Sequence, residues 1–129
     1  MRRIFRTRQF TRKMRKVGLS DAALLDAVDE MAQGLIDADL GGGLVKKRVA
    51  LPGRGKSGST RTIVATNKGN RWFFLYGFEK NEKVNISNDE LEALKTYATD
   101  LLKRTTTQLD DAVADGALQE ITHDRQDQA

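Results

Sequence analysis

Apolar residues follow a helical period in the first third of the chain. They lie three or four positions apart at Leu24, Val28, Met31 and Leu35. This is the spacing of one face of an amphipathic helix. Ser20 can cap the start of the helix and Gly34 can end it, so we predict a helix over residues 20–34. The basic segment before it, residues 9–17, is predicted to be a further helix or an arm.

A second helical pattern lies in the last third of the chain. Ser87 and Glu90 form an S-x-x-E capping box, in which each side chain accepts a hydrogen bond from the other residue's backbone. Apolar residues then recur at Leu91, Leu94, Ala98, Leu101 and Leu102. We expect this helix to run to about Arg104 and a short helix from Thr107 to Val113 to follow it. Residues 117–121 are a candidate edge strand.

The period changes to two in the middle of the chain. Apolar and basic residues alternate over residues 44–51, residues 60–67 are rich in β-branched side chains, and residues 71–78 are aromatic. Such segments favour strands. The glycine-rich segment 52–59 is predicted as a loop and Lys68-Gly69-Asn70 as a turn. Three strands joined by short links indicate an antiparallel meander.

Together these elements predict an α+β fold. N-terminal helices pack on a small antiparallel β-sheet, and a C-terminal helix packs back on that sheet. Residues 3–6 could add a short strand, and Phe74 and Phe78 are expected in the core. We assign residues 1–121 to a single domain and residues 122–129 to a polar, flexible tail.

Composition narrows the class of protein. The chain of 129 residues has no cysteine and one histidine, His123. It therefore offers neither a disulfide framework nor a thiolate metal site, and a histidine-dependent catalytic triad is disfavoured. No apolar run approaches the ~20 residues of a membrane span, and no apolar segment of a secretory signal follows the basic N-terminus. We expect a cytoplasmic protein without a membrane partner.

Charge is distributed unevenly along the chain. Residues 1–83 carry 18 basic and 8 acidic side chains, whereas residues 84–129 carry 4 basic and 10 acidic ones. The first sixteen residues hold eight basic side chains and no acidic one. This asymmetry predicts a face that binds a polyanion.

The basic loop between the first two strands of the meander is the strongest candidate for chemistry. Its sequence is GRGKSG, residues 53–58. A phosphate-binding P-loop would need glycine where Ala50 stands, and it would open a helix rather than a strand. What remains is a flexible loop that presents Arg54 and Lys56 beside Arg61, at the start of the next strand. Three cations gathered in this way can hold a phosphate.

Further cations and aromatic residues are candidates for RNA binding. Alternation along a strand sends Lys46 and Arg48 to one face and Lys47 to the other. Aromatic side chains among the basic ones could stack on bases; a packed core and a solvated surface are the alternative explanations. No pair of carboxylates stands in an apolar context, so no metal site is predicted. The candidate RNA-binding residues are Lys46, Lys47, Arg48, Arg71, Tyr76 and Lys83.

Four segments in this order resemble one family of proteins. They are residues 26–50, the GRGKSG loop, RTIVA at residues 61–65 and FFLYGFEKNEKVNI at residues 73–86. Together they resemble RelE/HigB-type toxins of bacterial type II toxin–antitoxin systems. The resemblance implies the same α+β fold and a metal-independent endoribonuclease, without a cofactor, that cleaves mRNA, commonly on the ribosome. It also implies a cognate antitoxin, often a helix-turn-helix DNA-binding protein.

The resemblance assigns roles to four basic residues. Arg61 matches the family arginine at the start of the strand after the loop and would stabilise the phosphate. Lys56 matches a loop cation and would transfer a proton or make a second phosphate contact. Arg54 matches the other loop cation. Lys80 matches a basic position after the aromatic strand.

Two features depart from the family pattern. Ser59-Thr60 stand where members usually carry a glycine and an aromatic residue, and no aromatic residue lies between Glu79 and Asn85, where some ribosome-dependent members carry a tyrosine. Two other functions stay open. One is a non-catalytic, gyrase-directed poison on the same fold, which generally lacks the loop cations. The other is a basic module that binds RNA without cleaving it.

Overall fold

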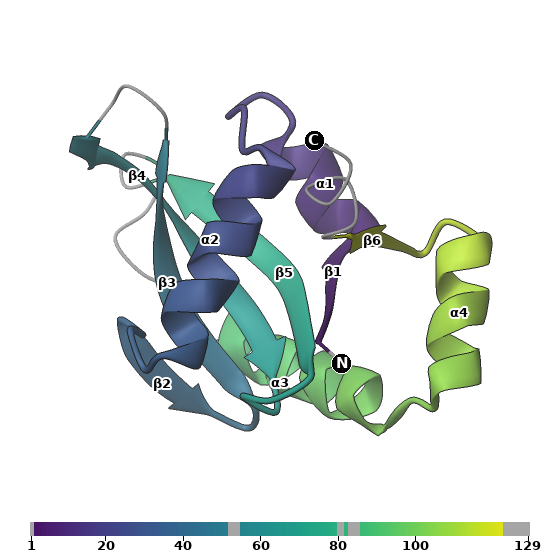
Figure 1. Cartoon of the computed structure of the whole chain (residues 1–129). Coiled ribbons are helices and arrows are strands. Elements are labelled where there is room, and N and C mark those ends of the chain that lie inside the picture. Colours follow the sequence, from purple (N-terminus) through teal and green to yellow (C-terminus); the bar gives the residue numbers. More distant parts are fainter. Residues whose placement is uncertain (1, 52–54, 80–81, 83–85, 123–129) are drawn as a thin grey trace.

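The computed structural model describes residues 2–51, 55–79, 82 and 86–122, and only the backbone at residues 55–59. These residues form six strands and four helices in an α+β arrangement, as the sequence predicts (Figure 1). In chain order the elements are β1 (Arg3–Thr7), α1 (Arg8–Met14), α2 (Asp21–Ala32), β2 (Ala38–Gly41), β3 (Leu44–Leu51), β4 (Gly55–Thr66), β5 (Arg71–Glu79), α3 (Asn88–Lys103), α4 (Thr106–Ala114) and β6 (Leu118–Ile121).

The strands form one six-stranded sheet in the order β2-β3-β4-β5-β1-β6. Strands β3, β4 and β5 make the predicted antiparallel meander. The sheet is mixed rather than purely antiparallel, because β1 pairs with β5 in parallel. A parallel pair needs a long connection between its strands, and here residues 8–70, about half of the domain, separate β1 from β5. The short strand β2, which pairs with β3, was not expected from the sequence.

Helices cover both sides of the sheet. Figure 1 shows α2 in front of the strands and α3 behind them. On the α2 side, α1 and α2 pack on a cluster that includes Val49, Trp72 and Phe74. On the α3 side, α3 and α4 pack on Ile63, Phe73 and other buried residues. The expected packing of the N-terminal helices and of the later helix on the sheet is confirmed.

The predicted helix starts are largely confirmed. Ser20 Oγ accepts a hydrogen bond from the Ala23 N–H (3.1 Å), which caps α2. Ser87 and Glu90 form the expected capping box at α3. The start predicted for α4 at Thr107 is wrong, because Thr105 caps this helix together with Gln108. The same S/T-x-x-E/Q signal stands two residues earlier in the sequence.

Two other boundaries differ from the prediction. Helix α2 ends at Ala32, so Leu35 lies beyond the helix and is 57% exposed instead of continuing its apolar face. Gly34, at φ +94°, takes the left-handed backbone that follows the helix end. Residues 55–59, predicted within a loop, begin β4, and Gly55 pairs with Leu51.

The first and last strands of the fold lie side by side. Ile4 is paired with Ile121 in the antiparallel ladder between β1 and β6. Arg3 donates two hydrogen bonds to the Glu120 carboxylate (2.8 and 2.9 Å) and one to Asp110 (2.9 Å). The hydrogen bonds to Glu120 are the main reason that the pKa of Arg3 is raised above its ordinary value. This ion-pair network joins the two ends of the domain.

Candidate functional site

Arg61 lies near the middle of the sheet on its α3 side. In the ladder it is opposite Arg48 of β3 and opposite Phe78 of β5. Alternation along β4 gives Arg61 the same side as Ile63 and Ala65, which belong to the α3-side cluster. Arg61 is half-buried. The central candidate of the sequence analysis is therefore flanked by a cation and an aromatic residue.

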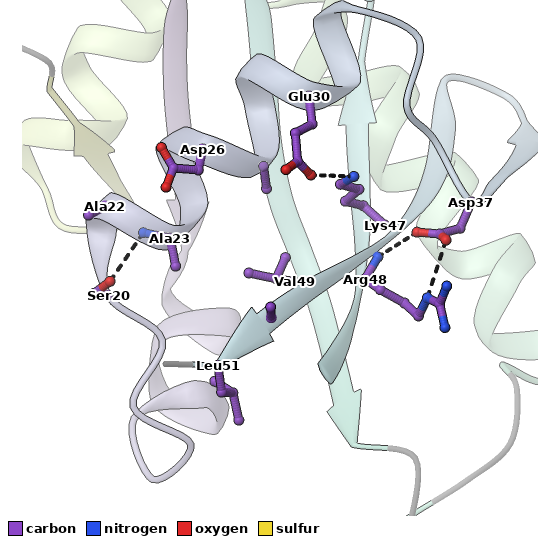
Figure 2. Close-up of a pocket in the computed structure, with 12 residues that line it drawn as sticks. Ser20, Ala22, Ala23, Asp26, Glu30, Asp37, Lys47, Arg48, Val49 and Leu51 are labelled. Atoms are coloured by element: carbon purple, nitrogen blue, oxygen red, sulfur yellow. Dashed lines mark hydrogen bonds and ion pairs between the residues drawn. The ribbon is translucent and has the colours of Figure 1, made fainter. Parts of the chain in front are cut away.

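Two more of the predicted RNA-binding cations lie on this same side. Lys46 is opposite Ile63, two pairs along the ladder from Arg48 and Arg61, and it is half-buried whereas Arg48 is exposed. The Arg48 Nε donates to Asp37 Oδ1 (3.3 Å), and the Arg48 backbone N–H donates to Asp37 Oδ2 (2.6 Å). Asp37 thus fixes the backbone and side chain of Arg48 at the outer edge of β3 (Figure 2).

Lys47 lies on the opposite side of the sheet, under α2. Its side chain is 9% exposed, and its Nζ is 2.7 Å from Glu30 Oε1 and 3.0 Å from the Leu35 carbonyl oxygen. Figure 2 shows the Lys47–Glu30 pair between β3 and α2. The expected separation of Lys47 from Lys46 and Arg48 is confirmed. Its ammonium group joins a helix to a strand and does not face the Arg61 side.

Tyr76 lies beside Phe78 on the α3 side, and their ring centroids are 6.0 Å apart. An irregularity in the β4–β5 register between Ile63 and Val64 brings these two residues to that side, although Trp72 and Phe74, of the same parity, face α2. A β-bulge has this effect because one extra residue reverses the alternation. Phe74 and Phe78 are fully buried, as expected for core residues.

Two residues that the sequence analysis did not select contact Tyr76. The Tyr76 hydroxyl donates to Glu90 Oε2 (3.0 Å), and the Lys13 Nζ lies 5.6 Å from the centre of the Tyr76 ring. Lys13 also forms an ion pair with Glu82 (3.2 Å). The sequence identifies Glu90 through its capping box alone. No local pattern connects Lys13 to Tyr76, because the two are more than sixty positions apart.

Arg71 lies far from Arg61 along the sheet. It begins β5, and its guanidinium donates to the carbonyl of Arg104 at the end of α3. Phe78, opposite Arg61, is seven residues further along the strand, which corresponds to about 20 Å. At this position Arg71 satisfies a carbonyl at a helix end, and it does not join the cations around Arg61.

The remaining candidates are not described in side-chain detail. Arg54, Lys80 and Lys83 lie outside the described residues, and for Lys56 only the backbone, within β4, is described. Among the described residues, no group of three or more His, Cys, Asp or Glu side chains could hold a metal ion. No helix in the described ranges is long and apolar enough to cross a membrane.

Comparison of the chain with known protein families shows to which family it belongs. Residues 2–121 match the family model described as the RelE toxin of the RelE/RelB toxin–antitoxin system. No curated protein matches the chain. The match spans every element of the fold, from β1 to β6. The chain therefore belongs to the RelE toxin family, and it is the toxin of a toxin–antitoxin system with a cognate antitoxin as its partner.

Proposed function

We propose that this toxin is a metal-independent endoribonuclease that cleaves mRNA on the ribosome and thereby inhibits translation. One observation carries the proposal: Arg61 stands between Arg48 and Phe78 on an otherwise well-packed sheet. Lys46 and the half-buried Tyr76 lie two pairs along the ladders, on the same side. Cations and an aromatic ring in this arrangement suit the phosphates and bases of a single RNA strand.

In the proposed reaction, the 2′-oxygen of one ribose attacks the adjacent phosphorus. A bond forms between this oxygen and phosphorus, while the bond from phosphorus to the 5′-oxygen of the next nucleotide breaks. The products are a 2′,3′-cyclic phosphate and a 5′-hydroxyl. The 2′-hydroxyl gives its proton to a general base, and a general acid gives one to the 5′-oxygen, so no external reagent is consumed.

Arg61 is assigned to the charge that develops on the non-bridging phosphate oxygens. A guanidinium that is held in position before the reaction stabilises this charge without reorganising. Arg48 and Lys46 are assigned to neighbouring phosphates. Their side chains leave β3 on the same side as Arg61, which allows one strand of RNA to contact all three cations.

The acid–base roles rest on the family resemblance. Lys56 is proposed to transfer the proton, and Arg54 and Lys80 to complete the phosphate site. A lysine can carry out proton transfer when neighbouring cations lower its pKa. We infer likewise that the toxin acts in the cytoplasm, where mRNA is translated, and that its antitoxin is a helix-turn-helix DNA-binding protein.

A coupled translation reaction with mapping of mRNA 5′ ends tests the proposal. The wild-type chain should create new 5′ ends, Arg61→Ala should not, and Arg2→Ala, which changes an arginine paired with Asp29 beside α2, should cleave like the wild type. Absence of new ends with the wild-type chain would overturn the proposal. Changes in DNA topology in place of RNA cleavage would indicate the gyrase-directed alternative.

A further inference from the structure

A pocket of about 500 Å³ lies between α1 and the middle of α3. Cationic, amide and aromatic side chains line this α1–α3 pocket, and none of the described residues that line it is acidic. The lining residues are Thr7, Arg8, Gln9, Arg12, Tyr97 and Ala117. A pocket of this composition suits a ligand that carries both negative charge and a flat ring.

The two arginines give the α1–α3 pocket a positive charge that is not compensated. The Arg8 Nε donates to the Gly116 carbonyl oxygen (3.2 Å), which fixes the side chain beside the turn before β6 without neutralising its charge. Arg12 is exposed and forms no ion pair with any described residue. Because both guanidinium groups keep their charge, the pocket attracts an anion.

Tyr97 supplies the aromatic ring of the α1–α3 pocket. It is 38% exposed, and its hydroxyl has no hydrogen-bond partner among the described residues. Partial burial is the main reason that the pKa of Tyr97 lies above its ordinary value, so the hydroxyl stays protonated and can donate. Asp100, whose charge also acts on Tyr97, is paired with Arg104 (2.9 Å). The ring and the hydroxyl can therefore both contact a ligand.

The α1–α3 pocket adjoins the proposed RNA site at Tyr76. The Tyr76 side chain contacts α1 through Lys13 and α3 through Glu90. Gln9, in the pocket, stands about one helical turn before Lys13 on α1. Tyr97 stands about two turns after Glu90 on α3, which corresponds to about 10 Å. The same two helices therefore flank Tyr76 and then the pocket.

The distance from the α1–α3 pocket to Arg61 is short enough for one RNA strand to reach both. Thr7 Oγ1 donates to the Leu75 carbonyl oxygen (3.5 Å), and Leu75 is three residues before Phe78, the ladder partner of Arg61. Strand β1 is two strands away from β4 in the sheet. Strand geometry then puts Thr7 about 15 Å from Arg61.

We propose that the α1–α3 pocket is a second RNA-binding subsite, which holds a nucleotide of the same strand that contacts Arg61. Arg8 and Arg12 contact a phosphate of this nucleotide, and its base stacks on Tyr97. The Gln9 amide and the Tyr97 hydroxyl form hydrogen bonds with the base edge or the ribose. The inference rests on the proposed function, because it takes RNA to be the substrate. No covalent step takes place in this subsite.

The composition of the α1–α3 pocket favours RNA over other anions. An acidic peptide would pair with the arginines but would leave the Tyr97 ring and the Gln9 amide without a specific partner. A free mononucleotide has suitable chemistry, but it cannot contact the cations around Arg61 at the same time. A longer RNA strand contacts both sites, so each contact strengthens the other through the high local concentration of the linked nucleotides.

Binding of RNA that cannot be cleaved tests the subsite. Oligonucleotides of about 4 and about 10 nucleotides, lengths typical of single-strand sites, carry 2′-fluorine in place of every 2′-hydroxyl. Tyr97→Ala should weaken binding of the longer RNA about tenfold, as expected for loss of one stacked base. Arg12→Ala should also weaken it and should lower the slope of its salt dependence by about 0.7. The shorter RNA, bound around Arg61, should lose little affinity with either variant. Fluorescence anisotropy measures these affinities.

Two control variants separate a local role from general effects of charge and packing. Arg15→Ala removes a cation from the end of α1 that lines a different cavity, and it should bind the longer RNA within about twofold of the wild type. Tyr97→Phe keeps the ring and should do the same. Circular dichroism checks each fold. Wild-type affinity for both Arg12→Ala and Tyr97→Ala would overturn the proposal, as would an equal loss of affinity in Arg15→Ala.

Cross-linking on the wild-type chain gives a second readout that needs no variant. A single 4-thiouridine is moved along the longer RNA, and mass spectrometry identifies the cross-linked peptides. Cross-links to the Tyr97 peptide should come from one end of the RNA, and their absence at every position would overturn the proposal. If micromolar adenosine 5′-monophosphate abolished them, the pocket would be a site for a free nucleotide instead. None of these readouts needs cleavage, so failure of the proposed nuclease activity would be recognised separately.

Discussion

Lys47 and Arg48 are neighbours in the sequence but occupy opposite sides of the sheet. The Lys47 ammonium is buried under α2 and held by Glu30 and a carbonyl oxygen. Arg48 is exposed, opposite Arg61 on the α3 side. A run of three cations at residues 46–48 is therefore divided between two sides of the sheet, and the position of a residue within the strand decides on which side it lies. Counting charges along such a segment overstates the surface that a polyanion can contact.

The largest expected effect is a loss of RNA cleavage, with little change in stability, when Arg61 is replaced. Arg61→Ala should reduce single-turnover cleavage of mRNA by about 10²–10³, the range for loss of one preorganised donor to a transition state. Its midpoint of thermal unfolding should change little, because Arg61 is half-buried and no described residue forms an ion pair with it. A matched drop in stability would mean that Arg61 is a structural residue and would remove the contrast with Lys47.

Loss of the Glu30–Lys47 ion pair under α2 should have the opposite effect, because it should lower stability and leave cleavage unchanged. Glu30→Ala leaves the Lys47 ammonium buried with one carbonyl oxygen, and we expect it to lower the free energy of unfolding by about 1–3 kcal/mol. The loss in the free energy of unfolding is at the lower end of this range if water reaches Lys47 where the half-exposed Glu30 side chain has been removed. Urea unfolding measures the change. Cleavage by the folded fraction should be unaffected, and a specific loss of cleavage would place Lys47 in the RNA site.

Tyr76 tests whether the aromatic pair on the α3 side contacts RNA. Tyr76→Ala should weaken binding of a single-stranded RNA by about 1–3 kcal/mol if a base stacks on the ring. Tyr76→Phe keeps the ring and loses the hydrogen bond to Glu90, so it should retain the affinity at a cost of about 0.5–1.5 kcal/mol in stability. Fluorescence anisotropy and urea unfolding distinguish the two changes. If Tyr76→Ala binds RNA as tightly as the wild type, Tyr76 has a role in packing and does not contact RNA.

The smallest effect concerns the salt dependence of RNA binding. Arg48→Ala and Lys46→Ala should each weaken the dependence of the logarithm of affinity on the logarithm of salt concentration by about 0.7, the value for one phosphate contact on a single strand. Lys47→Met should leave this slope unchanged, because the Lys47 ammonium faces α2. A lower slope for Lys47→Met would contradict the division of the two sides. The titrations require folded variants, which circular dichroism can verify beforehand.

Local chemistry made a large part of this fold predictable. The caps at Ser20 and Ser87 and the alternation along β3 are short-range signals, and they gave the two main helices, the meander and the opposite sides of Lys46 and Lys47. Pairings between distant segments carry no such signal. The parallel contact of β1 with β5 and the approach of Lys13 to Tyr76 depend on the tertiary fold, as does the burial of Lys47 against Glu30.

The candidate site was predictable in part. Alternation indicated that Lys46 and Arg48 share one face of their strand, but only the fold shows that this face also carries Arg61. The sequence could not indicate that Arg71 binds a helix end, since that depends on where α3 terminates. The bulge that turns Tyr76 toward α3 is likewise decided by packing, because both faces of β5 are apolar and the pattern of residues does not select a register.

The pairing of β1 with β6 has a consequence for engineering the chain. Because Ile4 and Ile121 are partners in one ladder, a linker of a few residues would join the two ends of the domain without crossing the sheet. New ends could then be opened in the exposed turn at residues 67–70, between β4 and β5. Such a circular permutant would keep every strand pairing. A purification tag would then be attached at the new ends and not beside Arg3 and Glu120.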